Sequence, residues 1–167
     1  FIGDATVNIY PDTRTLAEIA VQTARVARRF GVLPRVAMLS FSNFGSSREM
    51  RSNRVEEAVS LARELDPNLI IDGPMQADTA LVTDIQEQFP FMEFTGPANV
   101  LICPNLAAAN ISYKLLDHLG DAEMTGPILE GTAKPVQVLQ QGDGVRDVVN
   151  MAAICALDAQ RHARETL

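Results

Sequence analysis

The chain has 167 residues, of which 47% are hydrophobic, and its formal net charge at pH 7 is −7. These values are typical of one globular domain, or of two lobes, around an apolar core. The acidic balance, with no basic stripe, argues against nucleic acid or an anionic membrane as a partner. It leaves room for a small anionic molecule in a locally basic pocket.

Both cysteines, Cys103 and Cys155, lie inside apolar runs without a CxxC spacing. We interpret them as free thiols in a reducing compartment, which predicts a cytoplasmic location. No apolar run reaches the roughly 18–20 residues that a membrane span needs, and there is no signal peptide. Because the chain begins at Phe1 in what reads as mid-domain sequence, we expect it to be a piece of a longer protein.

Apolar periodicity predicts that strands alternate with helices along the chain. Thr15 and Glu18 indicate a capping box at the start of the first helix. The alternation predicts an α/β fold, with three αβα layers around a mostly parallel sheet. In chain order we expect a strand at 5–9, a helix at 15–30, a strand at 36–39, a helix at 54–65, a strand at 69–71, a helix at 78–88, a strand at 100–103, a helix at 107–119, strands at 127–129 and 136–139, and a helix at 145–164.

The stretch 99–119 combines a buried strand, a break at Pro104 and Asn105, and a helix. One face of this helix carries Ala108, Ile111, Leu115 and Leu119, and another carries Asn110, Tyr113, Lys114 and Asp117. Polar groups on a helix that follows a buried strand are typical of the ligand-binding corner of an α/β domain. An ordinary solvated helix face fits the same spacing equally well.

Other candidate groups carry weaker signals. The loop 40–47, which contains Ser42, offers the hydroxyl and N–H groups of a phosphate site, but it is not a P-loop. Asp72 and Asp78 could form an acid/base pair, or serve in a turn and as a helix N-cap. His118 and His162 have no ligands at metal spacing, so we expect no metal site.

A known pattern is repeated in order by seven segments: 1–9, 15–20, 35–40, 72–78, 109–114, 126–131 and 134–136. On these segments the chain resembles the phosphate acetyltransferase family. The resemblance implies the C-terminal portion of a phosphotransacetylase-like fold. It also implies one lobe over residues 1–130, while 131–167 form a strand and a helix that belong to the adjoining lobe.

One motif departs from the family. Family enzymes carry Leu-Ser-Arg-Gly before the last helix, where the serine and arginine are implied to handle the thiol proton and the charge of acetyl phosphate. This chain has Leu139-Gln140-Gln141-Gly142 and retains the following aspartate, Asp147. Neutral glutamines cannot supply the cation that stabilises a developing negative charge. We therefore predict no catalytic residue in this chain and no acetyl transfer by it alone.

The loop 42–46 and the paired glutamines are most similar to the phosphotransacetylase-like domain of bacterial NADP-dependent malic enzymes. That resemblance implies a regulatory module that binds acetyl-CoA and inhibits the oxidative decarboxylation of malate in a separate catalytic domain of the same parent chain. NADP and a divalent metal would belong to that catalytic domain, and no cofactor to this chain. A homo-dimer or higher homo-oligomer is also implied.

The residues implied to bind acetyl-CoA are Asn110, Tyr113, Lys114, Lys134, Asp147 and Ser42. Two alternatives stay open beside the sensor. One is an active phosphate acetyltransferase with an altered site, and the other is a purely structural dimerisation domain.

Overall fold

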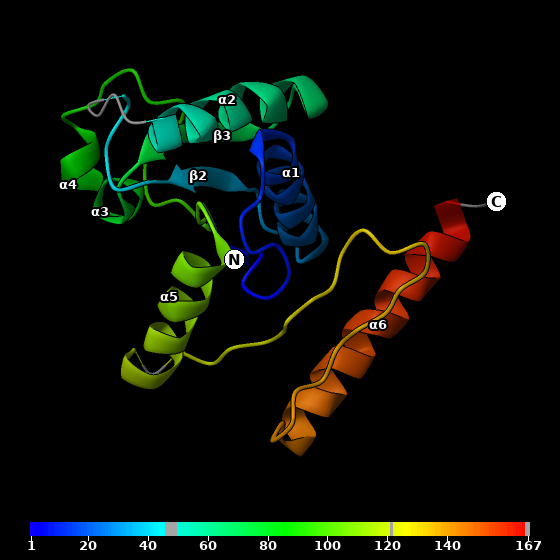
Figure 1. The fold of residues 1–167 in the computed structure, drawn as a ribbon. Helices are drawn as coiled ribbons and strands as arrows, with labels where there is room; N and C mark the ends of the chain where they lie inside the picture. Colours follow the sequence, from blue (N-terminus) through cyan, green and yellow to red (C-terminus); the bar gives the residue numbers. More distant parts are fainter. Residues whose placement is uncertain (46–49, 121, 166–167) are drawn as a thin grey trace. The chain divides into compact units, whose positions relative to one another are not determined.

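The computed structural model describes residues 1–45, 50–120 and 122–165 (Figure 1). The chain divides into two compact units, Phe1–Lys114 and Leu115–Leu167, and each is described here by itself. The predicted lobes, 1–130 and 131–167, refer to a larger protein and stay a prediction.

The first unit is built on a four-stranded parallel sheet in the order β1-β4-β2-β3. The strands are β1 (Ile2–Gly3), β2 (Arg35–Leu39), β3 (Ile70–Met75) and β4 (Val100–Ile102). Short apolar runs form these strands because a parallel sheet covered by helices buries both of its faces. The predicted α/β fold with a parallel sheet is confirmed.

Alternate side chains of β2 enter two separate cores. Val36 and Met38 pack beneath α1 (Thr13–Arg29) and α2 (Met50–Leu65), which lie against each other. Ala37 belongs to the core on the opposite face, beneath α3 (Ala77–Leu81) and the segment that runs to Ala98. The short helix α4 (Thr83–Gln86) contacts α3. Because successive side chains of a strand point to opposite faces, these two cores give the three predicted layers.

Two predictions near the amino end are wrong. Residues 5–9 form a loop rather than a strand, because the Asp4 carboxylate accepts hydrogen bonds from the backbone N–H groups of Val7 and Asn8. The capping box is also absent. The N-cap of α1 is Asp12, whose carboxylate accepts from Thr15 N, and Glu18 bonds Arg14 instead.

The predicted helix 78–88 is two short helices, since Val82 has the extended backbone angles φ −111° and ψ 114° between α3 and α4. Gln76 rather than Asp78 is the N-cap of α3. Asp72 lies inside β3 and not in a turn. β3 carries one extra residue opposite β2 at this point, which is a β-bulge.

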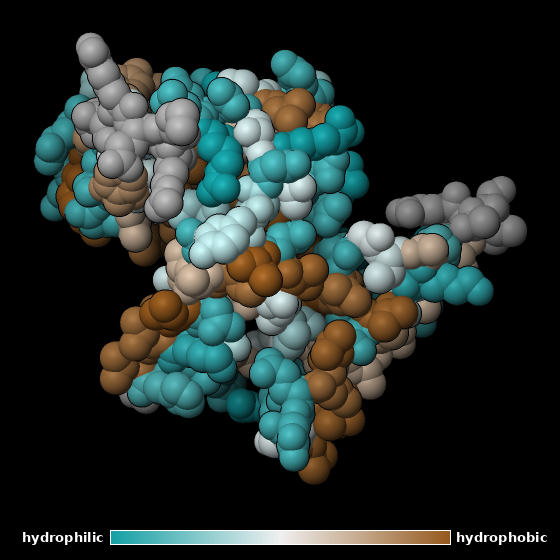
Figure 2. All heavy atoms as spheres, in the orientation of Figure 1, coloured by the Kyte–Doolittle hydropathy of each residue, from teal (hydrophilic) through white to brown (hydrophobic). Residues whose placement is uncertain are grey.

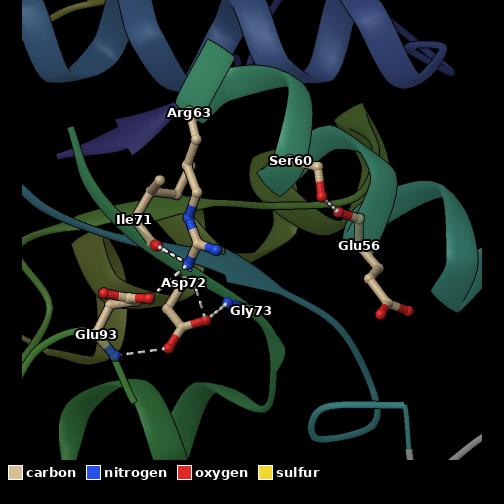
Figure 3. Close-up of polar contacts among 7 residues, drawn as sticks. All are labelled: Glu56, Ser60, Arg63, Ile71, Asp72, Gly73 and Glu93. Carbon is tan, nitrogen blue, oxygen red and sulfur yellow. Dashed lines mark hydrogen bonds and ion pairs between the residues drawn. The ribbon is translucent and has the colours of Figure 1, made fainter. Parts of the chain in front are cut away.

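Asp72 anchors a loop to the sheet, as Figure 3 shows. Its two carboxylate oxygens accept from Gly73 N and Glu93 N, both at 2.9 Å. Arg63 of α2 donates to Ile71 O at 2.9 Å and lies 3.6 Å from the carboxylates of Asp72 and Glu93. The network ties the helix, the strand and the loop together, which accounts for this buried aspartate without an acid/base role.

The second unit contains the end of α5 (Leu106–Leu119), an extended segment and α6 (Val145–Glu165). The predicted strands at 127–129 and 136–139 are not formed, and the described part of this unit contains no strand. Instead, Leu129 N donates to the side chain of Gln137, and Cys155 of α6 contacts Pro135 O. Within residues 1–45, 50–120 and 122–165, no helix has the length and apolar character needed to cross a bilayer.

Candidate functional site

The ligand-binding corner predicted on α5 lies where β1 and β4 end. These two strands are parallel neighbours, with Gly3 opposite Ile102. Their carboxyl ends therefore meet at one edge of the sheet, and the loop 4–12 lies beside the turn 103–105 that precedes α5. In open parallel sheets this edge is where ligands usually bind.

Asp4 shapes the loop after β1. Its backbone φ is +48°, and short polar residues such as aspartate adopt this left-handed conformation more readily than others. One carboxylate oxygen accepts from Val7 N at 2.8 Å, and the other accepts from the backbone and side-chain nitrogens of Asn8 at 2.9 and 2.7 Å. The loop is therefore held by its own side chains.

Hydrogen bonds join this loop to the start of α5. Asn105 caps the helix by accepting from Ala108 N at 2.9 Å, and Leu106 N donates to Ile9 O at 3.2 Å. The half-buried Asn110 donates its side-chain N–H to Ala5 O at 3.1 Å. This bond fixes the side chain of Asn110 and leaves its amide oxygen as an acceptor at the corner.

Tyr113 and Lys114 continue the same helix. The Lys114 ammonium lies 5.1 Å from the centre of the Tyr113 ring, Lys114 is exposed, and Tyr113 is half-buried. A contact between an aromatic ring and a solvent-exposed cation gains only about 0.5–1 kcal/mol. The lysine therefore remains able to reach an anion.

The loop that contains Ser42 is fastened to the end of β3. Asn43 accepts from Gln76 N at 2.7 Å, and Phe44 N donates to Pro74 O at 2.7 Å. Ser42 is buried. A ligand contact by its hydroxyl stays a prediction. Ser46 and Ser47 of the predicted loop lie outside the described residues.

Lys134 and Asp147 belong to the second unit, and their ligand roles also stay predictions. Lys134 is exposed. Asp147 accepts from Gly144 N at 2.9 Å, which caps the first turn of α6. The neighbouring Gln140 N donates to the Asp143 carboxylate at 2.7 Å and closes the turn that carries the paired glutamines.

The reactive side chains of Cys103, Asp78 and His118 show no second site. Burial raises the pKa of the Cys103 thiol to about 11, so this thiol is protonated and unreactive at neutral pH. Asp78 accepts from Thr79 N, and His118 is exposed beside Asp117. No group of three or more His, Cys, Asp or Glu residues that could hold a metal occurs in the described part of the chain.

The sequence analysis missed Arg54 of α2. Its Nη1 donates to Pro11 O at 2.8 Å and its Nη2 donates to Pro104 O at 2.7 Å, so this side chain reaches both loops of the corner. Its Nε is buried without a hydrogen-bond partner. The available signal was a cation early in a helix, where the helix dipole does not favour positive charge.

Known proteins share this sequence and fold. The NADP-dependent malic enzyme of Escherichia coli (strain K12) is 48% identical over 162 residues, which are 96% of this chain and 21% of that protein. The phosphate acetyltransferase of Bacillus subtilis is 45% identical over 158 residues, which are 94% of this chain and 49% of the enzyme. The chain therefore spans about half or about a fifth of these relatives' lengths.

Solved structures and a family match agree with these relatives. A phosphotransacetylase from Streptococcus pyogenes superposes with a TM-score of 0.92 at 39% identity, over 96% of this chain and 49% of that chain. Residues 1–156 match the phosphate acetyl/butaryl transferase description. The chain therefore belongs to the phosphate acetyl/butaryl transferase family.

Proposed function

We propose that the chain is a non-catalytic acetyl-CoA-sensing and oligomerisation domain of an NADP-dependent malic enzyme. The observation that carries this proposal is the neutral turn before α6, Leu139-Gln140-Gln141-Gly142. Acyl transfer to or from phosphate develops negative charge, which needs a fixed cation or several donors aimed at it. The turn supplies two exposed amides instead.

The arginine nearest to this turn in the sequence does not replace the missing cation. Arg146 donates to the Glu123 carboxylate at 2.7 Å, and this hydrogen bond raises the pKa of Arg146. The retained Asp147 accepts from the backbone at the start of α6. Arg146 and Asp147 are thus both engaged within the second unit.

Binding of the coenzyme needs less than catalysis does. Acetyl-CoA is a polyanion with amide and thioester groups, so cations and hydrogen-bonding side chains suffice to hold it. Lys114 and Lys134 are exposed cations in a chain of net charge −7. Asn110, Tyr113, Ser42 and Asp147 supply the polar groups of the proposed contacts.

A sensor must bind acetyl-CoA with different affinities in two states of the protein, because equal affinity shifts no equilibrium. The malate, NADP and divalent-metal sites would lie in a separate catalytic domain of the parent chain. Oligomerisation would let one binding event affect neighbouring copies. The 21% share of the Escherichia coli enzyme that this chain matches supports a domain within a longer protein.

Isothermal calorimetry with acetyl-CoA tests the binding. We expect a saturable signal with the wild-type chain, and no heat at millimolar ligand from a folded sample would overturn the proposal. In the full-length protein, acetyl-CoA should inhibit the decarboxylation of malate. An assay with acetyl phosphate and CoA should detect no acetyl-CoA.

Substitutions on α5 test the predicted residues. Lys114→Ala removes a cation, and Asn110→Asp replaces the donor that bonds Ala5 O with a carboxylate that is repelled by the ligand's phosphates. Each should weaken acetyl-CoA binding about tenfold, or about 1.4 kcal/mol. Ser112→Asp adds the same charge at an exposed position of the same helix and serves as the control. If both variants bind acetyl-CoA as tightly as the wild type, Asn110 and Lys114 do not form the binding site.

An active phosphate acetyltransferase is the second candidate, because the Bacillus subtilis enzyme is 45% identical over nearly the whole chain. The double variant Gln140→Ser/Gln141→Arg restores the family motif and separates the two candidates. Under the sensor proposal the wild type is inactive in acetyl transfer. Acetyl-CoA formed by the wild type above the background without protein would favour the enzyme, whereas activity gained only in the variant would favour the sensor.

A further inference from the structure

Arg54 is placed to join the two loops of the candidate site. Its guanidinium donates to Pro11 O at 2.8 Å in the loop after β1, and to Pro104 O at 2.7 Å in the turn after β4. We call this pair of contacts the Arg54 bridge. Pro11 and Pro104 lie 43 and 50 residues away from Arg54 in the sequence, so the Arg54 bridge exists only in the folded chain.

Both acceptors of the Arg54 bridge stand next to the N-cap of a helix. Pro11 precedes Asp12, which caps α1, and Pro104 precedes Asn105, which caps α5. A guanidinium is planar and presents its N–H groups at fixed angles, so one side chain sets the spacing of the two carbonyls. The bridge therefore fixes where α5 begins relative to the loop 4–12.

Within the described residues, no carboxylate forms a salt bridge with Arg54. Its Nε is enclosed and unpaired, and Arg54 itself is half-buried. A cation placed in this way is costly unless its remaining donors are well used. Arg54 donates one hydrogen bond to the loop 4–12 and one to the turn 103–105.

The position of the Asn110 side chain depends on the same loops. Asn110 donates to Ala5 O and Leu106 N donates to Ile9 O, so both of these bonds link α5 to the loop that the Arg54 bridge holds. We propose that Arg54 is a positioning residue for acetyl-CoA binding, which holds the loop 4–12 and α5 in the arrangement that orients Asn110. This inference rests on the proposed function and deepens it.

Three variants test the inference by calorimetry with acetyl-CoA. Arg54→Gln removes the charge and the fork, while Arg54→Lys keeps the charge but cannot hold both carbonyls in the same way. Arg35→Gln is the matched control, because the half-buried Arg35 also donates to a backbone carbonyl, Pro97 O at 2.9 Å, at the opposite end of the strands.

We expect both Arg54 variants to weaken acetyl-CoA binding about tenfold and to speed hydrogen exchange at Leu106 N. Arg35→Gln should leave both quantities within twofold of wild type, even where it lowers the melting temperature as much. If Arg54→Lys binds like wild type and only Arg54→Gln is weak, the charge acts directly on the ligand and the positioning role is wrong.

The remaining outcomes are also decisive. Wild-type binding with no change in either Arg54 variant rejects this inference and leaves the proposed function standing. Absence of binding by the wild type rejects both. If neither Arg54 variant folds, Arg54 is a residue of the core structure, and the positioning role is rejected as well.

Discussion

The two longest helices in the described part of the chain bury their apolar side chains to very different extents. In α1, eight residues are buried, because the helix packs on α2 and the sheet. In α6, which is longer, Met151 is buried, but Val145, Val148, Val149 and Leu157 are exposed. Figure 2 shows apolar side chains at the surface along this part of the chain. The first unit encloses its own core, and the second leaves much of its apolar surface open to water.

This difference matters for where stability arises. Full burial of a large apolar side chain contributes about 1.5–3 kcal/mol, and an exposed one contributes little. The first unit is therefore expected to dominate the unfolding free energy of the chain. Substitutions of the same type in the two units can measure how far this holds.

Truncation of a leucine gives the largest expected contrast. Leu16 of α1 is fully buried, so Leu16→Ala should lower the unfolding free energy by about 2–5 kcal/mol through lost burial and a cavity. Leu157→Ala on α6 removes an exposed side chain and should change it by less than about 0.5 kcal/mol. Urea unfolding followed by circular dichroism measures both. Equal losses would mean that Leu157 is covered in solution.

Two glycines sharpen the comparison at the level of the backbone. Gly73 has φ +136°, and an added Cβ would lie 2.6 Å from Met38 O and 2.9 Å from Met38 Cβ. Gly73→Ala should therefore cost about 2–4 kcal/mol through strain and a clash between β2 and β3. Gly142 has φ +104° with nothing within 4 Å, so Gly142→Ala should cost about 1 kcal/mol from strain alone. The same unfolding assay applies, and a larger loss at Gly142 would contradict the prediction.

The two thiols should differ in reactivity. Cys103 is buried with a pKa of about 11, whereas Cys155 is partly exposed. At pH 8 the thiolate fraction of Cys103 is roughly 200-fold below that of an unperturbed cysteine of pKa about 8.5, before burial slows access further. Labelling with a thiol reagent in Cys155→Ser and Cys103→Ala variants measures each rate. Comparable rates in native buffer would show that β4 opens easily.

The raised pKa of Cys103 also determines how the free energy of unfolding changes at alkaline pH. The pKa of Cys103 is higher in the folded state than in the unfolded state. The protonated thiol therefore contributes fully to the free energy of unfolding below about pH 8.5, and this contribution is lost as the pH rises toward 11. The Cys103→Ala variant should therefore lose less unfolding free energy than the wild type as the pH is raised above about 8.5. An identical pH dependence in both proteins would mean that other groups cause the loss.

Much of the fold follows from local patterns. The apolar runs of β2 and β4 and the helical stripes of α1, α2 and α6 predict these elements within a few residues. The failures have physical causes that lie outside such patterns. Val7 and Ile9 alternate like a strand but are exposed, because the side chain of Asp4 turns the backbone.

Local sequence patterns also fail in the second unit. The segments 127–129 and 136–139 have strand-like composition, but a strand needs a partner with free backbone groups, and the Gln137 side chain bonds Leu129 N instead. In the candidate site, the spacing of Asn110, Tyr113 and Lys114 on one helix was visible in the sequence. The bonds from Asn110 to Ala5 and from Arg54 to Pro11 and Pro104 join distant segments, which no local pattern reports.

Ion pairs give the smallest expected contrast between the units. Arg28 and Asp66 approach to 2.7 Å in the first unit, where the Asp66 side chain is 17% exposed. Arg146 and Glu123 have the same separation in the second unit, but the Glu123 side chain is 75% exposed. The hydrogen bond from Arg28 lowers the pKa of Asp66, so its carboxylate is favoured in the folded state. At pH 7, Asp66→Asn should lower the unfolding free energy by about 0.5–1 kcal/mol.

The sign of the pH dependence follows from this lowered pKa. The contribution of Asp66 is present above the unfolded pKa of about 3.9 and is lost as the pH falls through the lower folded value. The unfolding free energies of the wild type and Asp66→Asn should therefore converge as the pH falls below about 4. Glu123→Gln should match the wild type across the same range, because water screens a pair that is exposed on both sides. A convergence of the same size for Glu123→Gln would mean that the second unit shields this pair from solvent.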